Sequence, residues 1–560
     1  MRKYNQNDGS ALMKYRTERD PLGTLRVPDD AYYGVQTLRA VENFPISGMT
    51  APPELVVATV RIKKAAAQAN RDLGRLDGLV ANAIVRAADE ILGGALRDQF
   101  VVDVYQAGAG TSHNMNTNEV LANRAAEILG APRGEYSLVH PNDHVNMGQS
   151  TNDVFPTATR LAILSMQNDL VSSAHALAGS LEKKSREFDG LLKTGRTHLQ
   201  DAVPITLGQE FSGYAANVAH AATDLERTAH QLLELNLGAT AVGTGLNAGD
   251  DYTELAIANL AQEMDLPLRP AANRFRVTQS MGDVLAWSGA LRRLAVEVSK
   301  IASDLRLLSM GPRAGIAEIQ LPSVQPGSSI MPGKVNPSVP EMVNQVCYQV
   351  YGCDATIQAA ADGGQLELNV MMPVMAWNAL HASRILRQAM RVLNERCVAG
   401  IKADESRARE LLDRSTAVAT ALSPYIGYAA TADIAKNAVA TGRTIRDLVL
   451  ERGLLPPDQL DRILSAEAMT TAGVPGENRG PSHAAPRKDS TRRGAGASAD
   501  TRRKSGAGGR TNAPAAHASV PAGKSRPARA AGSRRVAAPR SDHGRAPDRG
   551  RQRRRGPGRG

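Results

Sequence analysis

Hydrophobic positions repeat at helical spacing along two long stretches of the chain. The first stretch runs from Leu207 to Leu235, with apolar residues at alternating steps of four and three. The second runs from Val284 to Leu308 and alternates in the same way. This 3.5-residue repeat is typical of long helices that pack side by side at a shallow angle. The pattern therefore predicts a helical bundle.

A third stretch, from Glu54 to Leu92, also has helical periodicity and is predicted to be helix. No alternation typical of strands extends over a comparable length. Apolar seams this long need equally long partners, which favours a multi-helix bundle and an oligomer. A large monomeric helical core is the alternative that the pattern leaves open.

The composition agrees with a helical core. Aromatic residues make up only 4% of the chain, so Leu, Val, Ile and Ala must fill the interior. The three cysteines, Cys347, Cys353 and Cys397, form no CxxC pair, which predicts buried, reduced thiols in a cytoplasmic protein and no metal site. No apolar run is long enough for a membrane span, and the first residues lack the apolar region of a signal peptide.

The charge is divided unevenly along the chain. Residues 479–560 hold 22 Lys and Arg against four Asp and Glu, whereas the rest holds 45 against 52. The same segment lacks Leu, Ile, Met and aromatic residues, which predicts a disordered basic tail over 477–560. We expect at most weak, non-specific, salt-sensitive binding of this tail to polyanions. A shifted reading frame in GC-rich DNA would produce the same composition and is an alternative origin.

Three segments rich in Gly, Pro and polar residues interrupt the helical pattern, at 108–153, 195–204 and 327–337. The first is rich in neutral hydroxyls and amides, which suit a carboxylate held without a metal ion. Helix capping and turn formation are the alternative role for these residue types. The residues in question are Thr111, Ser112, Asn114, Asn116, Ser150, Thr151 and Asn152.

The second segment contains Thr197 and His198, just before a helix predicted to begin near Pro204. A single histidine is more often structural than catalytic, so the residue type alone leaves its role open. The glycine-rich stretch Gly238–Gly249 lacks both glycine patterns of phosphate-binding loops, which argues against phosphate binding there.

The third segment carries two serines, Ser328 and Ser329, between glycines, followed by Lys334 and Asn336. Glycines allow close approach of the backbone to a ligand. Lys334 offers a fixed cation for a carboxylate or for developing carbanion charge. A serine acts as a base only in a strongly electropositive site, so an ordinary Gly/Ser turn is the alternative.

The sequence GSSIMPGKVNP over residues 327–337 resembles the signature loop GSSxMPxKxNP of the aspartase/fumarase superfamily and matches every fixed position. The resemblance extends over about 16–476. It implies an all-α subunit whose long central helices join those of three other subunits in a homotetramer. It also implies three domains at 1–152, 153–400 and 401–476, and active sites assembled from three subunits.

The resemblance further implies the roles of individual residues. Ser328 resembles the general base, on a mobile loop, and His198 resembles a catalytic residue that pairs with Glu341. The mechanism implied is anti elimination through an aci-carboxylate, without cofactor or metal. The substrate ligands implied are Thr111, Ser150, Thr151, Asn152, Thr197, His198, Ser329, Lys334, Asn336 and Arg39.

Several stretches, including LRAVENF, GTSHNMNTNEV and PEMVNQV, favour the aspartase branch, in which ammonia leaves L-aspartate to give fumarate. Others, including VHPNDHVN and GRTHLQDA, are shared with fumarases, so interconversion of malate and fumarate is the alternative activity. Met372 departs from both branches, which usually carry a charged residue there. An inactive structural homologue is a further alternative, against which the intact Ser328, Lys334, His198 and Glu341 argue.

Overall fold

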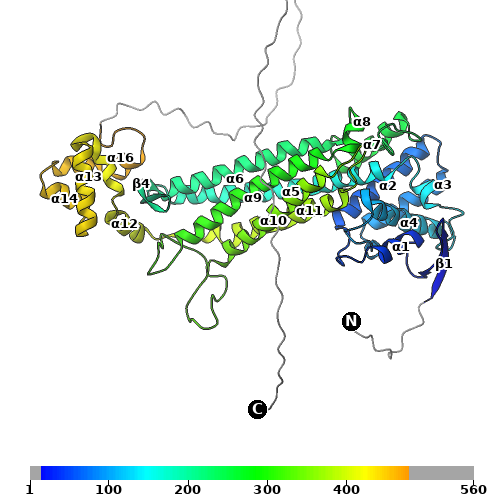
Figure 1. The fold of residues 1–560 in the computed structure, drawn as a ribbon, viewed down its shortest axis with the longest axis horizontal. Helices are drawn as coiled ribbons and strands as arrows, with labels where there is room; N and C mark the ends of the chain where they lie inside the picture. Colours follow the sequence, from blue (N-terminus) through cyan, green and yellow to red (C-terminus); the bar gives the residue numbers. More distant parts are fainter. Residues whose placement is uncertain (1–13, 478–560) are drawn as a thin grey trace, which may run out of the picture. The chain divides into compact units, whose positions relative to one another are not determined.

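Five long helices lie side by side in a bundle (Figure 1), in a computed structural model that describes residues 14–477. Between them they bury the largest apolar cluster of the described residues. This architecture confirms the predicted all-α fold. The helices are α5 (Thr151–Glu187), α6 (Leu207–Ala229), α9 (Gly282–Leu308), α10 (Ser338–Asp362) and α11 (Met372–Arg396).

Polar pairs between the helices establish their directions. Arg160, near the start of α5, donates to Asp283 at the start of α9 at 2.6 Å, so these two helices begin at the same end of the bundle. The Tyr214 hydroxyl, early in α6, donates to Asp304, late in α9, at 2.8 Å. Helix α6 therefore runs antiparallel to α5 and α9.

The length of α5 separates the two ends of the bundle. Ser150 caps its N-terminus in a capping box with Asp153, which satisfies otherwise free backbone N–H groups. The helix then continues for 37 residues, which at 1.5 Å per residue is about 55 Å. Segments before and after α5 therefore lie at opposite ends of the bundle.

An N-terminal layer packs on the first turns of α5. It has its own buried apolar cluster, centred on residues such as Val60, Ile84 and Leu121. Its elements are β1 (Tyr15–Asp20), β2 (Gly23–Pro28), α1 (Val35–Asn43), α2 (Pro53–Asp72), α3 (Gly78–Leu92) and α4 (Thr111–Ile128).

The stretch Glu54–Leu92 is helical, as predicted, but it forms two helices, α2 and α3, with a break between them. Gly74 adopts a φ of +68°, a left-handed conformation that ends α2. Asp77 then starts the next helix, since its side chain accepts the backbone N–H of Leu79 at 2.8 Å. The apolar spacing continues across the break, and for this reason the pattern concealed it.

The helix predicted over Leu207–Leu235 ends early, at Ala229. A 3-10 turn and the short strand β5 (Glu234–Leu235) follow, the latter paired with β6 (Arg269–Pro270). Leu232 and Leu235 are nevertheless buried, so the apolar periodicity outlasts the helix.

The helix predicted to begin near Pro204 begins at Leu207. The residues before it form a β-hairpin of β3 (Leu192–Thr197) and β4 (Gln200–Thr206). Thr206 caps α6, because its hydroxyl accepts the backbone N–H of Gln209 at 3.0 Å. The hairpin lies at the far end of α5 from Ser150.

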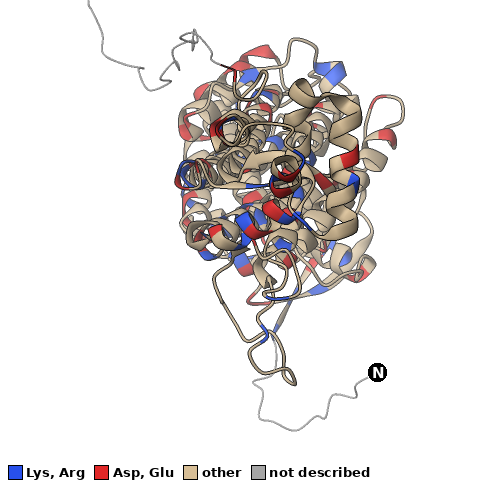
Figure 2. Cartoon of the chain, turned by 90° about the vertical axis from the view of Figure 1, so that its left-hand side faces the viewer, with Lys and Arg blue, Asp and Glu red and all other residues tan. Residues whose placement is uncertain are grey.

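A small C-terminal group of helices has a separate apolar cluster around Leu422, Ile434 and Leu460. Basic and acidic residues alternate along its helices (Figure 2), and an exposed ion pair joins Arg446 to Asp461 at 2.8 Å. The three-domain division remains a proposal, which the separate clusters support. The helices are α12 (Glu405–Arg414), α13 (Ser423–Thr441), α14 (Ile445–Glu451), α15 (Pro457–Ile463) and α16 (Ala466–Thr470).

The three cysteines are free and buried, as predicted. Burial raises the pKa of both Cys347 and Cys397 to about 12, which keeps these thiols protonated and unreactive. Among residues 14–477, no helix is long and apolar enough to cross a membrane. The predicted basic tail, apart from Glu477, lies outside the described residues.

Candidate active site

The turn that starts α5 brings three predicted substrate ligands together. The Ser150 hydroxyl oxygen accepts the backbone N–H of Asn152 at 3.2 Å, and the Ser150 N–H donates to Asp153 at 2.9 Å. Thr151 is the first helical residue. The positive end of the helix dipole favours an anion at such a turn. The three side chains therefore frame a position suited to a carboxylate.

Thr111 is the first residue of α4 and lies next to the same end of α5. Gly110 precedes it with a φ of +85°, and a Cβ at Gly110 would lie 2.1 Å from the Phe155 ring of α5. Only glycine therefore permits this approach of α4 to α5. The Thr111 hydroxyl is exposed and donates to the carbonyl of Gly108 at 3.3 Å.

A buried network of hydrogen-bonded polar side chains holds Thr151 in place. The Lys63 ammonium of α2 donates to Asn146 Oδ1 at 2.8 Å and to Gln149 Oε1 at 2.9 Å. Asn114 Nδ2 donates to Asn146 Oδ1 at 3.3 Å and to Thr151 Oγ1 at 3.1 Å. This network thus connects the fully buried amine of Lys63 to Thr151, a predicted substrate ligand.

Burial shifts the charged groups of this region in opposite directions. It lowers the pKa of Lys63 to about 7, and the nearby Asp153 carboxylate opposes this shift. It raises the pKa of Asp153 to about 7, against the effect of backbone N–H groups from Ser150, Thr240 and Gly238. Both groups therefore lose much of their preference for the charged state.

The glycine-rich stretch after α6 holds the turn in place. Asp153 Oδ2 accepts the backbone N–H groups of Gly238 at 3.0 Å and Thr240 at 2.9 Å. Asn152 Nδ2 donates to the carbonyl of Ala241 at 2.8 Å. The stretch Gly238–Gly249, which lacks the patterns of a phosphate-binding loop, therefore holds the start of α5 in position.

A helix-internal proline adds a further link near the start of α5. Pro156 has no N–H and leaves the carbonyl of Asn152 without its helical donor. Asn236 Nδ2 donates to that carbonyl at 3.1 Å and replaces the missing bond. Asn236 Oδ1 in turn accepts from the buried Arg160 guanidinium at 3.2 Å.

Thr197 and His198 lie on the tip of the β3–β4 hairpin. His198 and Leu199 have positive φ values of 54° and 59°, the left-handed conformation of a tight hairpin turn. Both predicted site residues are exposed. Arg196 anchors the hairpin through the buried carboxylate of Glu318, at 2.9 Å.

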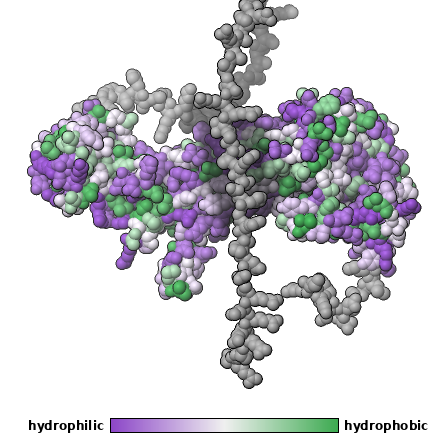
Figure 3. Space-filling view, in the orientation of Figure 1, coloured by the Kyte–Doolittle hydropathy of each residue, from purple (hydrophilic) through white to green (hydrophobic). Residues whose placement is uncertain are grey.

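The serine loop, residues 327–337, comes after Glu318 and the short strand β7 (Ile319–Gln320). It projects from the bundle, with hydrophobic groups at its tip (Figure 3). The Gly327 N–H donates to the Lys334 carbonyl at 2.9 Å, and Asn336 Nδ2 donates to the Gly327 carbonyl at 2.8 Å. A Cβ on Gly327 would lie 2.4 Å from the Lys334 carbonyl oxygen, so glycine is required. These bonds close the loop around Ser328 and Ser329.

Two backbone N–H groups of the serine loop bond to the Ser328 side chain. Its Oγ accepts two backbone N–H groups, from Ile330 at 3.2 Å and Met331 at 3.0 Å. Two fixed donors on one oxygen stabilise an alkoxide in the same way as they stabilise an oxyanion. Lys334 is exposed in the same loop and adds a positive charge.

Three other predicted site residues lie in or near these elements, and only Arg39 belongs to a different part of the chain. Ser329 is exposed in the loop, and Glu341 is half-buried in the first turn of α10. Among the described residues of one chain, no hydrogen bond joins Glu341 to His198. Arg39 is held by Asp20 at 2.7 and 2.9 Å, and this pairing raises the pKa of Arg39. Its guanidinium is therefore engaged within the N-terminal layer.

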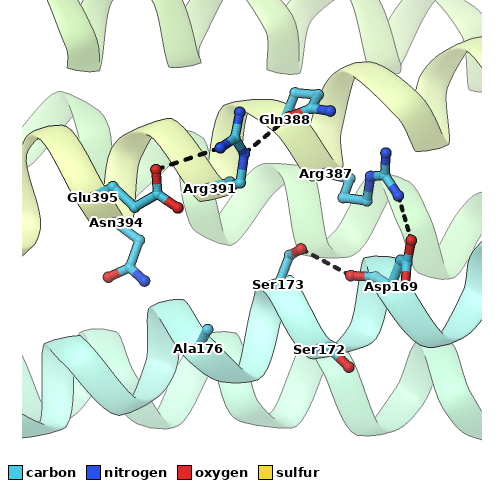
Figure 4. A pocket seen from close by; sticks show the side chains of 9 residues that line it. All are labelled: Asp169, Ser172, Ser173, Ala176, Arg387, Gln388, Arg391, Asn394 and Glu395. Carbon is cyan, nitrogen blue, oxygen red and sulfur yellow. Dashed lines mark hydrogen bonds and ion pairs between the residues drawn. The ribbon is translucent and has the colours of Figure 1, made fainter.

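The predicted site residues thus form two groups at opposite ends of the bundle. Thr111 and Ser150–Asn152 lie where α5 begins, whereas Thr197–His198 and the serine loop follow its far end, about 55 Å away. A single chain does not bring the two groups together. A separate pocket lies between α5 and α11 (Figure 4) and is lined by Asp169, Arg387, Arg391 and Asn394. None of the predicted site residues lines this pocket.

Three groups of the candidate site carry no role in the sequence prediction. Asn146 and Asp153 lie within the polar segment 108–153, and Lys63 lies in a stretch predicted only to be helix. A signal for Lys63 existed, because it shares one face of α2 with Thr59 and Asn70 at helical spacing. A polar stripe on a buried helix face predicts a polar cluster beneath it.

Comparison with known proteins identifies the family. Residues 23–352 match the family model described as "Lyase", and residues 418–471 match the model described as "Fumarase C C-terminus". An aspartate ammonia-lyase from a Bacillus species is 49% identical over 461 residues, which cover 82% of this chain and 98% of that protein.

Solved structures agree with this assignment. A fumarate lyase:delta crystallin from Brucella melitensis, bound to cobalt, is 52% identical with a TM-score of 0.78, over 81% of this chain and 99% of that one. A class II fumarase from Schistosoma mansoni is 37% identical with a TM-score of 0.78, over 81% and 98%. The chain therefore belongs to the aspartase/fumarase superfamily of lyases.

Proposed function

We propose that the protein is an aspartate ammonia-lyase, which converts L-aspartate reversibly to fumarate and ammonia. The structural observation that carries the proposal is the Ser328 hydroxyl oxygen, which accepts two backbone N–H groups beside Lys334. Identity to an aspartate ammonia-lyase (49%) exceeds identity to a class II fumarase (37%), which favours ammonia over water as the leaving group.

The elimination follows from the chemistry of the serine loop. The Ser328 alkoxide takes a proton from Cβ of the substrate, and the electron pair of that C–H bond moves into the adjacent carboxylate. The dianionic aci-carboxylate so formed is stabilised by Lys334 and by the loop dipoles. The electron pair then forms the Cα–Cβ double bond while the C–N bond breaks, and its electrons leave with ammonia.

The leaving-group pocket suits an ammonium. Because Asn152 Nδ2 is engaged by the Ala241 carbonyl, Asn152 presents its oxygen as an acceptor that has no partner among residues 14–477. Met372, where relatives carry a charge, is fully buried in the bundle core and adds no cation of its own. An acceptor oxygen at this position favours a departing ammonium, which donates hydrogen bonds, over a departing water.

A complete site requires more than one copy of the chain. Ser150–Asn152 and Ser328 lie at opposite ends of α5, so a second copy must supply one of the two groups. A homotetramer in which the bundles of four copies pack together would provide this arrangement. The pairing of His198 with Glu341 would likewise form between copies.

A direct assay distinguishes the two activities. Fumarate formation, followed by ultraviolet absorbance without added nucleotide, is compared for L-aspartate and L-malate at matched concentrations. We expect turnover of aspartate and no useful turnover of malate. Faster formation of fumarate from malate would make the protein a fumarase, and turnover of neither would indicate an inactive homologue. The cytoplasmic location and the weak polyanion binding of the tail remain predictions.

A further inference from the structure

We propose that Asn114 is a positioning residue which, held by Lys63 through Asn146, fixes the Thr151 hydroxyl as a hydrogen-bond donor toward a substrate carboxylate. The inference rests on the proposed function in one respect, the role of Thr151 as a carboxylate ligand. It adds a group that does not touch substrate and a reason for the buried lysine.

The direction of each hydrogen bond follows from the donor-only character of the lysine. An amine that bonds to an amide side chain must meet its oxygen, so Asn146 turns Oδ1 toward Lys63. The other end of the same amide agrees, since Asn146 Nδ2 donates to the Gln149 carbonyl at 3.2 Å. The orientation of Asn146 is therefore determined twice.

Asn114 inherits its orientation from Asn146. Only its Nδ2 can bond to an acceptor such as Asn146 Oδ1, and the second hydrogen on that nitrogen reaches Thr151 Oγ1 at 3.1 Å. Thr151 Oγ1 thus accepts within the protein. Among the described residues its own hydrogen has no acceptor, so it is left for a ligand.

The directions of these hydrogen bonds do not depend on the charge of Lys63. Burial lowers the pKa of Lys63 to about 7, so the neutral amine is accessible near neutral pH. A neutral amine keeps two N–H donors, which are enough for Asn146 and Gln149. The Thr151 hydroxyl therefore stays a donor over the whole range in which Lys63 titrates.

The arrangement also explains an otherwise unfavourable feature of Asn114. Its Oδ1 is buried without a hydrogen-bond partner among the described residues, a state that normally costs stability. Rotating the amide would place Asn114 Oδ1 against Asn146 Oδ1, and Thr151 would then donate to Asn114 instead of to a ligand. The unpaired oxygen is the cost of presenting both N–H groups in the required direction.

A double-mutant cycle tests the proposal. Asn114→Leu removes the donor to Thr151 and also the unpaired oxygen, so we expect it to fold. The KM for aspartate and the inhibition constant of succinate should both rise about 10- to 100-fold, as for loss of a hydrogen bond to a charged group. The value of kcat should change much less. In a Thr151→Val background, Asn114→Leu should have almost no further effect.

A matched control is available one helical turn later. Asn118 is also fully buried in α4 with an unpaired Oδ1, but its amide contacts Met115 and has no link to Thr151. Asn118→Leu should leave the KM and the succinate constant at wild-type values. If Asn114→Leu does not yield folded protein, Asn114→Ser takes its place in the same cycle.

The outcomes separate this inference from the proposed function. An unchanged KM in Asn114→Leu would overturn the positioning role of Asn114. The same conclusion would follow if the fold-changes in KM caused by Asn114→Leu and Thr151→Val multiplied in the double variant. Neither result would affect the proposed function, provided that the wild type turns over aspartate. A wild type without aspartate turnover would overturn the proposed function. Succinate binding would then still report on the positioning role of Asn114, because succinate presents the same two carboxylates.

Discussion

The Asp153 carboxylate accepts the backbone N–H of Thr240 at 2.9 Å, although 87 positions separate the two residues. The same oxygen accepts the N–H of Gly238 at 3.0 Å, so the start of α5 depends on the conformation of a distant loop. Gly238 is the residue that permits this conformation. It has a φ of +85°, and a Cβ there would lie 1.9 Å from Thr253 Oγ1.

Gly238→Ala should therefore destabilise the protein and displace the turn Ser150–Asp153 at the start of α5. We expect a loss of at least ~2 kcal/mol in the free energy of unfolding, from overpacking and backbone strain together. Urea denaturation measures this loss. Gly190→Ala is the matched control, because Gly190 has a φ of +79° with no atom within 4 Å of the added Cβ. Equal losses in the two variants would show that the contact with Thr253 is unimportant.

Ser328→Ala should abolish turnover without changing the oligomeric state, because a loop hydroxyl contributes little to packing. General bases typically contribute about 10²–10⁴-fold to the rate. Steady-state assays and light scattering measure the two properties. Ser323→Ala, at an exposed position before the loop, should retain wild-type activity. More than about a tenth of wild-type activity in Ser328→Ala would exclude Ser328 as the base.

His113 makes stability depend on acidity. Burial lowers the pKa of this histidine from 6.5 to about 4, and the charge of nearby Lys63 adds to the shift. Its Nε2 lies 3.0 Å from Thr59 Oγ1, whose hydroxyl donates to Leu55, so Nε2 carries the proton of the neutral ring. The depressed pKa means that its contribution is complete above pH 6.5 and is lost as the pH falls toward 4.

His113→Gln should therefore flatten the acid limb of the stability profile. Between pH 6.5 and 4 the wild type should lose about 3 kcal/mol more than the variant. Urea midpoints taken at intervals of pH measure the difference. Parallel acid limbs for the two proteins would show that His113 does not titrate as its burial indicates.

Truncation after Gly476 should preserve kcat and the oligomeric state. The boundary is chosen because Gly476 still packs on Ile463 and the Tyr425 hydroxyl donates to the carbonyl of Pro475 at 2.5 Å. Removing the basic residues beyond it should weaken retention on a polyanion column at low salt. The full chain in high salt provides the control, since salt should release it as well. A dissociated truncated protein would place the boundary elsewhere.

The bundle could be predicted because burial along a long helix imposes its own spacing on the sequence. Val284 to Leu308 illustrate this, since the predicted seam coincides with α9. The hairpin that carries His198 could not be predicted in this way. Its strands show no alternation of apolar residues, and its position depends on contacts with Glu318, more than a hundred positions away.

The candidate site likewise contains residues that a local pattern predicts and residues that depend on distant contacts. The roles predicted for Ser328 and Lys334 rest on a short local pattern that can be read directly from the sequence. The role of Lys63 cannot be read in this way, because its partners lie 83 and 86 positions away and only the folded chain brings them together. The break at Gly74 is an intermediate case, because the glycine and the capping Asp77 are local signals, whereas the apolar spacing continues across them.

The length of α5 has a consequence for inheritance. A chain disabled at Asn152 still carries an intact Ser328, and a chain disabled at Ser328 still carries an intact Asn152. In the proposed homotetramer, some sites of a mixed assembly would receive one sound segment from each chain. Two defective alleles with lesions at opposite ends of the bundle should therefore restore part of the activity in one cell, whereas two lesions at the same end should not.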